Sequence, residues 1–288
     1  MRCTATSPRA LKDCLEALAE RYDERFLDTD PVGIVRRYDR PEDREIVAFL
    51  AAGLAYGRVA SIRGSLERLV AILGARPSRF VDAFDPSRDA RRFDGFTHRF
   101  HAGSDVALYL GLLARAKASA GSLEAFWLRG APSGTSGTIG EALDAFGQRL
   151  FALDPRATDR VRFFLPLPRS GSVCKRSCLL LRWLVRPDDG VDCGVWTRVG
   201  RERLVLPLDT HLIRVVKALG WTRRKSPGWG MALEATARLR LLDPGDPVRF
   251  DFALSRLGIL GLVRARRGRL RRGAIEAALA ASAAGPRS

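Results

Sequence analysis

The sequence predicts an all-α protein. In most segments of the 288-residue chain, apolar residues recur at the three- and four-residue spacing of an amphipathic helix. The two-residue alternation of a half-buried strand is limited to one short candidate at 204–206. No apolar run approaches the roughly 20 residues that a membrane-spanning helix needs, and the N-terminus lacks the apolar core of a signal peptide. We therefore expect a helical protein of the cytoplasm.

The N-terminal part of the chain contains four predicted helices. Residues 8–27 form the first and residues 30–38 the second. Residues 41–43 (Pro-Glu-Asp) place acidic side chains in the first turn of a strongly apolar helix, which we expect in the central core. The fourth helix ends at Gly74, because glycine suits a helix C-terminus.

Residues 75–104 are rich in arginine, aspartate, phenylalanine and proline, and we expect residues 93–105 to form a loop. This segment contains His98, His101, Phe93, Phe96 and Phe100. Basic groups interleaved with aromatic rings can stack nucleobases. A loop that packs these side chains on the core is the alternative, and we favour it.

The rest of the chain continues the helical pattern. Helices are predicted at 105–117, 122–128, 140–153 and 229–241, with a glycine-rich connection at 130–140. A further apolar helix contains Asp251, an unusual residue in such a segment, which could pair with a core arginine or hold the Asp209 segment. The basic segment 264–273 fits a solvated or phosphate-facing arm.

The chain is strongly basic. Its net charge is +17, from 49 lysines and arginines against 32 aspartates and glutamates. A field of that sign favours a polyanionic partner, because neutralising phosphates releases condensed counterions. An arginine-biased proteome would give the same balance, so charge alone indicates nucleic acid without establishing it.

One stretch places a carboxylate at the start of a helix. Residues 204–208 are an apolar run, and Asp209 follows them at the start of an amphipathic helix that ends at Gly220. Asp209 can accept the unpaired N–H groups of the first helical turn. A plain N-cap is one interpretation of this residue, and a catalytic carboxylate is the other.

Upstream, a turn leads into a basic helix. The turn is predicted from Pro166, Pro168, Ser170 and Gly171. The helix that follows carries Lys175, Arg176, Arg182 and Arg186. Because backbone N–H groups at a turn and a helix start can cradle a phosphate, this segment is a candidate phosphate site.

Residues 207–215 (PLDTHLIRV) resemble the aspartate segment V-D-T-H-x-x-R-V of the HhH-GPD DNA glycosylases, the endonuclease III type. Residues 171–175 (GSVCK) are similar to the hairpin G-V-G-x-K of that family, which ends on the Schiff-base lysine of its bifunctional members. Two features depart from the pattern: Val173 replaces the second hairpin glycine, and residues 186–196 (RPDDGVDCGVW) lengthen the linker. Most of residues 40–260 resembles an uncharacterised bacterial family of this superfamily still more closely.

The resemblance implies a DNA N-glycosylase of base-excision repair, with AP-lyase activity if the lysine is a nucleophile. Removal of a damaged base breaks the C1′–N bond through an oxocarbenium-like transition state, which a nearby carboxylate stabilises. Asp209 would supply that carboxylate and activate the nucleophile. Lys175 would attack C1′ and form a Schiff base, or would contact a phosphate instead. The extruded base must first leave the stack.

The resemblance also implies a two-lobed helical fold with a cleft between the lobes. Residues 41–190 would form the central lobe, with a helix-hairpin-helix-like element at about 158–185, and residues 1–40 would join 204–288 in the second lobe. Expected DNA contacts are Arg169, Ser170, Gly171, Ser172, Arg176, Arg182 and His211. Tyr56 or Arg58 would be the wedge beside the extruded base, although a buried tyrosine and a surface arginine are the alternative.

Two other functions stay open. A non-catalytic DNA-binding protein for damage recognition would keep the same hairpin and basic cleft. An RNA-binding or nucleolytic protein would need a carboxylate cluster for a metal, and Asp188, Asp189 and Asp192 are the candidates for it, although we favour a solvated loop there.

The cysteines indicate no cofactor. No cysteine follows Cys193, so the four-cysteine iron–sulfur loop found in many endonuclease III relatives is excluded. Zinc at Cys174, Cys178 and Cys193 would need a fourth ligand, with His211 as the nearby histidine, and we favour buried thiols. We expect a monomer that binds DNA, in duplex form, associates with the nucleoid and does not contact a membrane.

Overall fold

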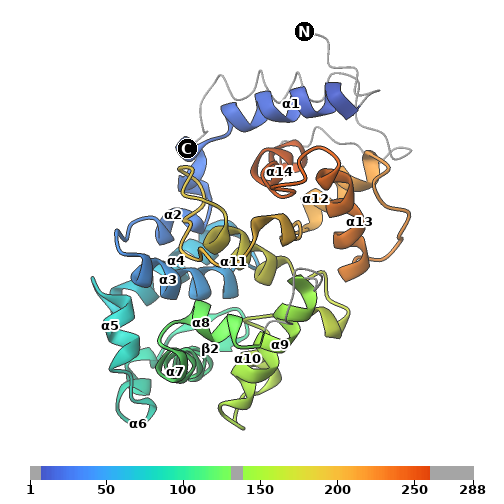
Figure 1. The fold of residues 1–288 in the computed structure, drawn as a ribbon. Coiled ribbons are helices and arrows are strands. Elements are labelled where there is room, and N and C mark those ends of the chain that lie inside the picture. The colour runs from blue at the N-terminus through green and yellow to red at the C-terminus, as the bar shows by residue number, and fades with distance from the viewer. Residues whose placement is uncertain (1–7, 131–138, 260–288) are drawn as a thin grey trace.

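The structure is a computed structural model that describes residues 8–130 and 139–259. The described chain is mostly helical, which confirms the all-α class (Figure 1). The basic segment 264–273 and most of the 130–140 connection lie outside the described residues. The elements are α1 (Pro8–Arg21), η1 (Glu24–Thr29), α2 (Val32–Val35), α3 (Pro41–Gly53), α4 (Val59–Leu73), α5 (Pro77–Asp82), α6 (Pro86–Asp89), η2 (Ala90–Phe93), β1 (Thr97–His98), β2 (His101–Ala102), α7 (Gly103–Ala120), α8 (Leu123–Leu128), α9 (Ile139–Ala152), α10 (Asp159–Arg162), η3 (Pro168–Ser170), α11 (Lys175–Val185), η4 (Arg201–Arg203), α12 (Thr210–Ala218), α13 (Trp229–Arg240) and α14 (Asp251–Ile259).

Helices α3 and α11 pack against each other in the middle of the molecule (Figure 1). The residues of α3 from Glu45 to Gly53 are all buried, as its apolar composition predicts. The α2 helix packs on α3 and α4, and α5 bridges α3 and α7. This arrangement makes the α3–α11 pair the frame on which the candidate residues are held.

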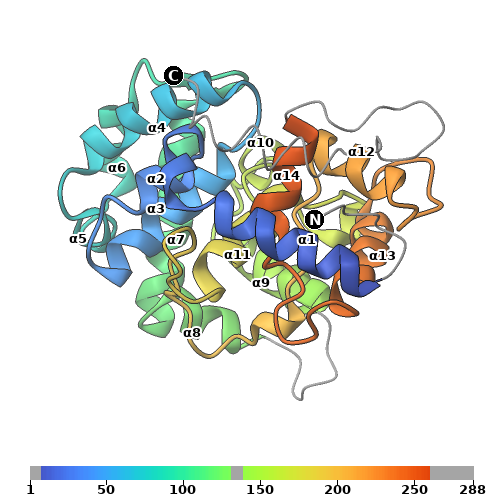
Figure 2. The same cartoon turned by 90° about the horizontal axis from the view of Figure 1, so that it is seen from above.

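The N-terminal helix joins the C-terminal part of the chain. Helix α1 crosses α14, and α14 packs along α12 (Figure 2). Residues 8–27, predicted as one helix, divide into α1 and η1 because Asp23 caps η1 by accepting the N–H of Arg25. The division into lobes at residues 41–190 stays a prediction.

Two secondary-structure predictions were wrong. Residues 204–206 are extended but form no strand, because Leu206 N–H donates to the Thr236 hydroxyl on α13 (3.0 Å) and not to a neighbouring strand. The predicted loop at 93–105 contains the β1–β2 hairpin and the start of α7. Residues 75–92, for which no element was predicted, contain α5 and α6, and Asp85 caps α6 by accepting the Ser87 N–H at 2.8 Å.

Candidate functional site

Asp209 is the N-cap of α12, as the sequence predicts. Its Oδ1 atom accepts the backbone N–H groups of His211 and Leu212, each at 2.8 Å. Its Oδ2 atom makes no hydrogen bond within residues 8–130 and 139–259, and the side chain is half-buried. One oxygen therefore fixes the carboxylate at the start of α12.

His211 lies on the first turn of α12, beside Asp209. Its Nδ1 atom is buried and has no hydrogen-bond partner among the described residues. Buried polar atoms are rarely left without a partner, so a water molecule or a ligand group is expected there. This placement keeps His211 among the candidate contact residues.

The predicted turn before α11 is present. Gly171 has the left-handed conformation that glycine favours (φ +73°), and Cys174, just before α11, also has a positive φ of 53°. Arg169 and Ser170 are exposed, and the Arg169 N–H donates to Asp144 Oδ1 at 3.1 Å. The backbone N–H groups of Ser172 and Val173 donate no hydrogen bond to any described residue.

Lys175 is the first residue of α11 and is half-buried. Its Nζ atom donates to the backbone carbonyl of Ala55 at 3.4 Å. This hydrogen bond joins the start of α11 to the segment after α3 that contains Tyr56 and Arg58. Lys175 and Asp209 make no hydrogen bond or ion pair with each other.

The two wedge candidates differ in exposure. Arg58 is exposed. Tyr56 is half-buried, and its hydroxyl bonds to the His101 ring and lies 3.1 Å from the His98 carbonyl. Burial raises the pKa of Tyr56 to about 12. Of the two candidates, Arg58 is therefore the more exposed side chain.

Arg176 is buried, contrary to the expected phosphate contact. Only 7% of the residue is exposed, and its Nη1 donates to the Gly53 carbonyl at 3.2 Å. Its guanidinium lies 3.6 Å from the ring centroid of Phe163 and 5.1 Å from that of Tyr56. Burial lowers the pKa of Arg176 to about 10. The residue supports the aromatic rings and does not face solvent.

Arg182 and Arg186 are also buried, with exposed fractions of 3% and 8%. Arg182 Nε donates to both oxygens of Asp192, at 3.1 and 3.2 Å, and its Nη1 pairs with Asp251. Arg186 pairs with Asp192 too, and its Nε donates to Asp246 at 2.8 Å. Arg182 is therefore not placed to contact DNA as expected, because buried carboxylates bind its guanidinium.

The favoured interpretation of the Asp188–Asp192 turn as a solvated loop holds only in part, because Pro187, Asp188 and Asp189 are exposed whereas Val191 and Asp192 are buried. Asp188 accepts hydrogen bonds from Arg36 and Arg44, both at 2.8 Å. Trp196 is buried, and its ring N–H donates to Glu45 at 2.6 Å. The aspartates of this segment are thus bound to arginines and are not grouped around a metal position.

Asp251 is influenced by the charges of both Arg182 and Asp209. Burial raises the pKa of Asp251 to about 6, Arg182 opposes that rise, and the nearby negative charge of Asp209 adds to it. Asp251 begins α14, which packs along α12. The predicted pairing of Asp251 with a core arginine is confirmed.

The histidines of the β1–β2 hairpin pack on the core, as favoured. His101 Nε2 lies 2.7 Å from the Arg160 carbonyl and must donate to it, so Nδ1 of the neutral ring accepts from the Tyr56 hydroxyl. By the same reasoning His98 donates to the Tyr56 carbonyl (3.1 Å) and accepts from Ser65 (2.9 Å). Burial lowers the pKa of both rings.

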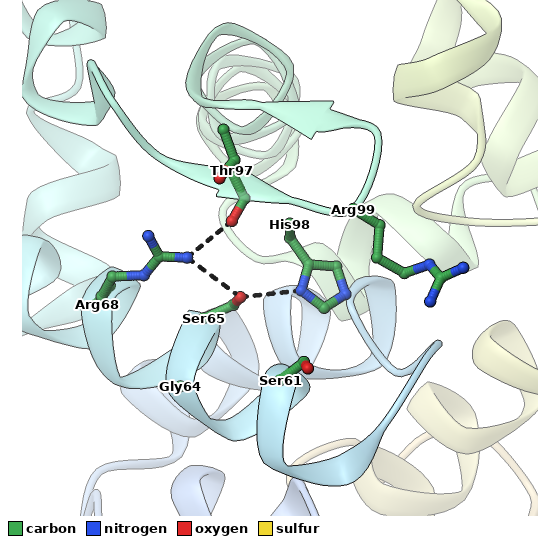
Figure 3. Close-up of a pocket in the computed structure, with 7 residues that line it drawn as sticks. All are labelled: Ser61, Gly64, Ser65, Arg68, Thr97, His98 and Arg99. Atoms are coloured by element: carbon green, nitrogen blue, oxygen red, sulfur yellow. Dashed lines mark hydrogen bonds between the residues drawn. The ribbon is translucent and has the colours of Figure 1, made fainter.

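Sequence reasoning missed a pocket between α4 and this hairpin (Figure 3). Its volume is about 400 Å³, and no carboxylate is among its described lining residues. We call it the basic groove; its lining is Ser61, Gly64, Ser65, Arg68, Thr97, His98 and Arg99. Only a tertiary contact between α4 and the hairpin creates it, so neither segment signals it alone.

No group of three potential metal-ligating side chains occurs among the residues that the structure describes. Cys174, Cys178 and Cys193 are buried free thiols, as favoured. Burial raises the pKa of Cys174 to about 12 and that of Cys193 to about 11. Within the described ranges, no helix has the length and apolar character to cross a bilayer.

Comparison with known proteins gives one match. A model of one protein family matches residues 30–260, a range that contains all the candidate residues from Tyr56 to His211. No curated protein and no solved structure matches the chain. The chain belongs to the family described as "Protein of unknown function (DUF2400)".

Proposed function

We propose that the protein is a DNA N-glycosylase that removes an extruded damaged base, with AP-lyase activity from Lys175. The observation that carries the proposal is the geometry of Asp209. One carboxylate oxygen is held by two backbone N–H groups at 2.8 Å, and the other has no partner among the described residues. A carboxylate held in this way can stabilise a cationic sugar without reorganising.

The chemistry follows from the roles of two side chains. As the C1′–N bond breaks, positive charge develops on the sugar, and Asp209 Oδ2 is the oxygen available to stabilise it. The Lys175 amine, once deprotonated, attacks C1′ as the base leaves, and the resulting Schiff base permits strand cleavage. The pairing of α1 with α14, and of α14 with α12, supports the two-lobed HhH-GPD arrangement for these residues.

DNA binding is supported by the charge and by the hairpin. The net charge of +17 favours a polyanion. Exposed Arg169 and Ser170 and the uncommitted N–H groups of Ser172 and Val173 suit a phosphate at the start of α11. Arg58 would occupy the gap left by the extruded base.

A non-catalytic DNA-binding protein is the second candidate. It is favoured by the hydrogen bond from Lys175 Nζ to the Ala55 carbonyl, which directs the amine toward α3. In that case the hairpin would contact DNA phosphates while Asp209 acted only as an N-cap.

Borohydride trapping separates the two candidates. The wild-type protein would be incubated with duplexes that carry an abasic site or one of a panel of oxidised and alkylated bases. We expect a covalent adduct that Lys175→Gln loses and that Lys217→Gln keeps, because Lys217 also donates to a backbone carbonyl (Lys225 O, 2.8 Å) but lies outside the site. Duplex binding without an adduct or base release on any substrate would favour the second candidate.

A further inference from the structure

Two exposed phenylalanines that are not part of the proposed catalytic site lie side by side. Phe100, in the turn of the β1–β2 hairpin, is 47% exposed, and Phe163, at the end of α10, is 38% exposed. Their ring centroids are 4.9 Å apart and their planes are inclined by 71°, an edge-to-face arrangement. We call this pair the aromatic platform. Exposed apolar rings are costly in water unless a partner covers them.

The side chains packed against the aromatic platform fix its position. Tyr56 packs against both rings, with centroids 5.5 Å from Phe100 and 5.2 Å from Phe163. The Tyr56 hydroxyl is fixed by His101, and the buried guanidinium of Arg176 stacks on Phe163. A platform whose support is already ordered loses little conformational entropy when a ligand stacks on it.

The basic groove lies beside the platform, and the hairpin contributes to both. In Figure 3, Arg68 and Arg99 stand on either side of Ser61 and His98. Arg68 uses Nη2 for the Thr97 carbonyl (2.7 Å) and Ser65, which leaves its Nε and Nη1 without a partner among the described residues. Arg99 makes no hydrogen bond or ion pair within those residues.

The backbone of Arg99 has an energetically unfavourable conformation. Arg99 has a left-handed φ of 54°, which is uncommon for a residue with a side chain. Its side chain lies against Gly57, 3.1 Å from the place where a β-carbon would stand, and Gly57 itself has a φ of +101°. A larger residue at 57 would displace the Arg99 side chain, so both residues are suited to this arrangement.

We propose that the aromatic platform and the basic groove bind an unpaired nucleotide of single-stranded DNA. The base stacks on the face of Phe100 and contacts the edge-to-face neighbour Phe163, and the adjoining phosphate accepts hydrogen bonds from Arg99, Arg68 and the Ser61 hydroxyl. Every nucleobase has a face that stacks on an aromatic ring, so this subsite tolerates any sequence. The inference shares with the proposed function only the choice of DNA as ligand, and it needs neither Asp209 nor Lys175.

Fluorescence anisotropy with a labelled, undamaged oligothymidine tests the inference. We expect Phe100→Leu to weaken binding by about 5-fold to about 100-fold, and Phe163→Leu to weaken it less, without a change in salt dependence. Phe100→Trp should retain affinity because it retains the stacking surface. Arg99→Gln should weaken binding and lower the slope of log K against log salt by about 0.7, the change expected for one phosphate of a single strand.

Two surface variants and two ligands are the controls. Leu241→Ala removes an exposed apolar side chain (73% exposed) and Arg79→Gln an exposed arginine, and neither should alter affinity by this amount. An oligonucleotide of abasic sites should bind the wild type as weakly as oligothymidine binds Phe100→Leu. Equal binding of abasic and thymidine strands, equal effects of Leu241→Ala and Phe100→Leu, or tighter binding of oligouridine RNA would overturn the inference. The ligand contains no substrate base, so these results do not depend on glycosylase activity.

Discussion

Replacing Arg182 with methionine should destabilise the protein strongly. Methionine keeps much of the length of the side chain but removes the charge that lies between Asp192 and Asp251. All three residues are buried, with exposed fractions of 3%, 0% and 3%. Removing one partner of a buried ion pair leaves an uncompensated charge and costs about 3–5 kcal/mol. That cost is a large part of the roughly 5–15 kcal/mol that stabilises a typical domain.

Urea denaturation measures this loss. Arg182→Met should lower the midpoint while leaving the slope with denaturant close to that of the wild type. The double variant Arg182→Met/Asp251→Asn should recover part of the loss, because it removes the negative charge of Asp251 that Arg182→Met leaves without an arginine, whereas Asp192 keeps Arg186. Arg25→Met is the control, since Arg25 pairs with Asp23 at 2.9 Å on the surface and such pairs contribute about 1 kcal/mol or less. Equal losses in Arg182→Met and Arg25→Met would refute the argument that burial makes this network important.

Three further predictions concern single side chains. Asp209→Ala should lower the free energy of unfolding by about 1 kcal/mol through loss of the N-cap, whereas Asp209→Asn should be close to the wild type in thermal unfolding; equal losses would contradict the cap. Because the pKa of Asp251 is raised from 3.8 to about 6 in the folded state, its stabilising contribution of about 3 kcal/mol is complete below pH 4 and lost as the pH rises past 6. Asp251→Asn should therefore flatten the dependence of unfolding free energy on pH between 4 and 7, and identical profiles would show that Asp251 does not titrate there. Arg176→Met should lower the free energy of unfolding by about 1–3 kcal/mol, less than Arg182→Met, because it removes a hydrogen bond to the Gly53 carbonyl but no ion pair with a described carboxylate; a loss as large as that of Arg182→Met would contradict this.

The parts of the fold that local chemistry determines could be predicted from the sequence. The apolar stretch of α3 and the start of α12 at Asp209 depend on residues within one or two helical turns. The end of α4 at Gly74 is equally local, since Gly74 has a φ of +71°. Such signals are contained within short windows of sequence.

Burial of the arginines could not be predicted in this way. Arg182 looks like a surface residue of a basic helix until Asp251, 69 positions later, is brought beside it. Arg176 is likewise buried by Phe163 and Tyr56, which lie in other elements. The basic groove and the aromatic platform also require tertiary contacts, namely those of the β1–β2 hairpin with α4 and α10. Residue type alone therefore assigned too many arginines to DNA.

The most direct test of the proposed function is base release by Asp209→Asn. Release of free base would be measured on lesion-containing duplexes, with Asp85→Asn as the matched control because Asp85 is also a helix N-cap. We predict that the wild type and Asp85→Asn release a damaged base and that Asp209→Asn is slower by about 100-fold or more, at unchanged stability. Equal rates in Asp209→Asn and the wild type, or no release from any duplex that the wild type binds, would contradict the account.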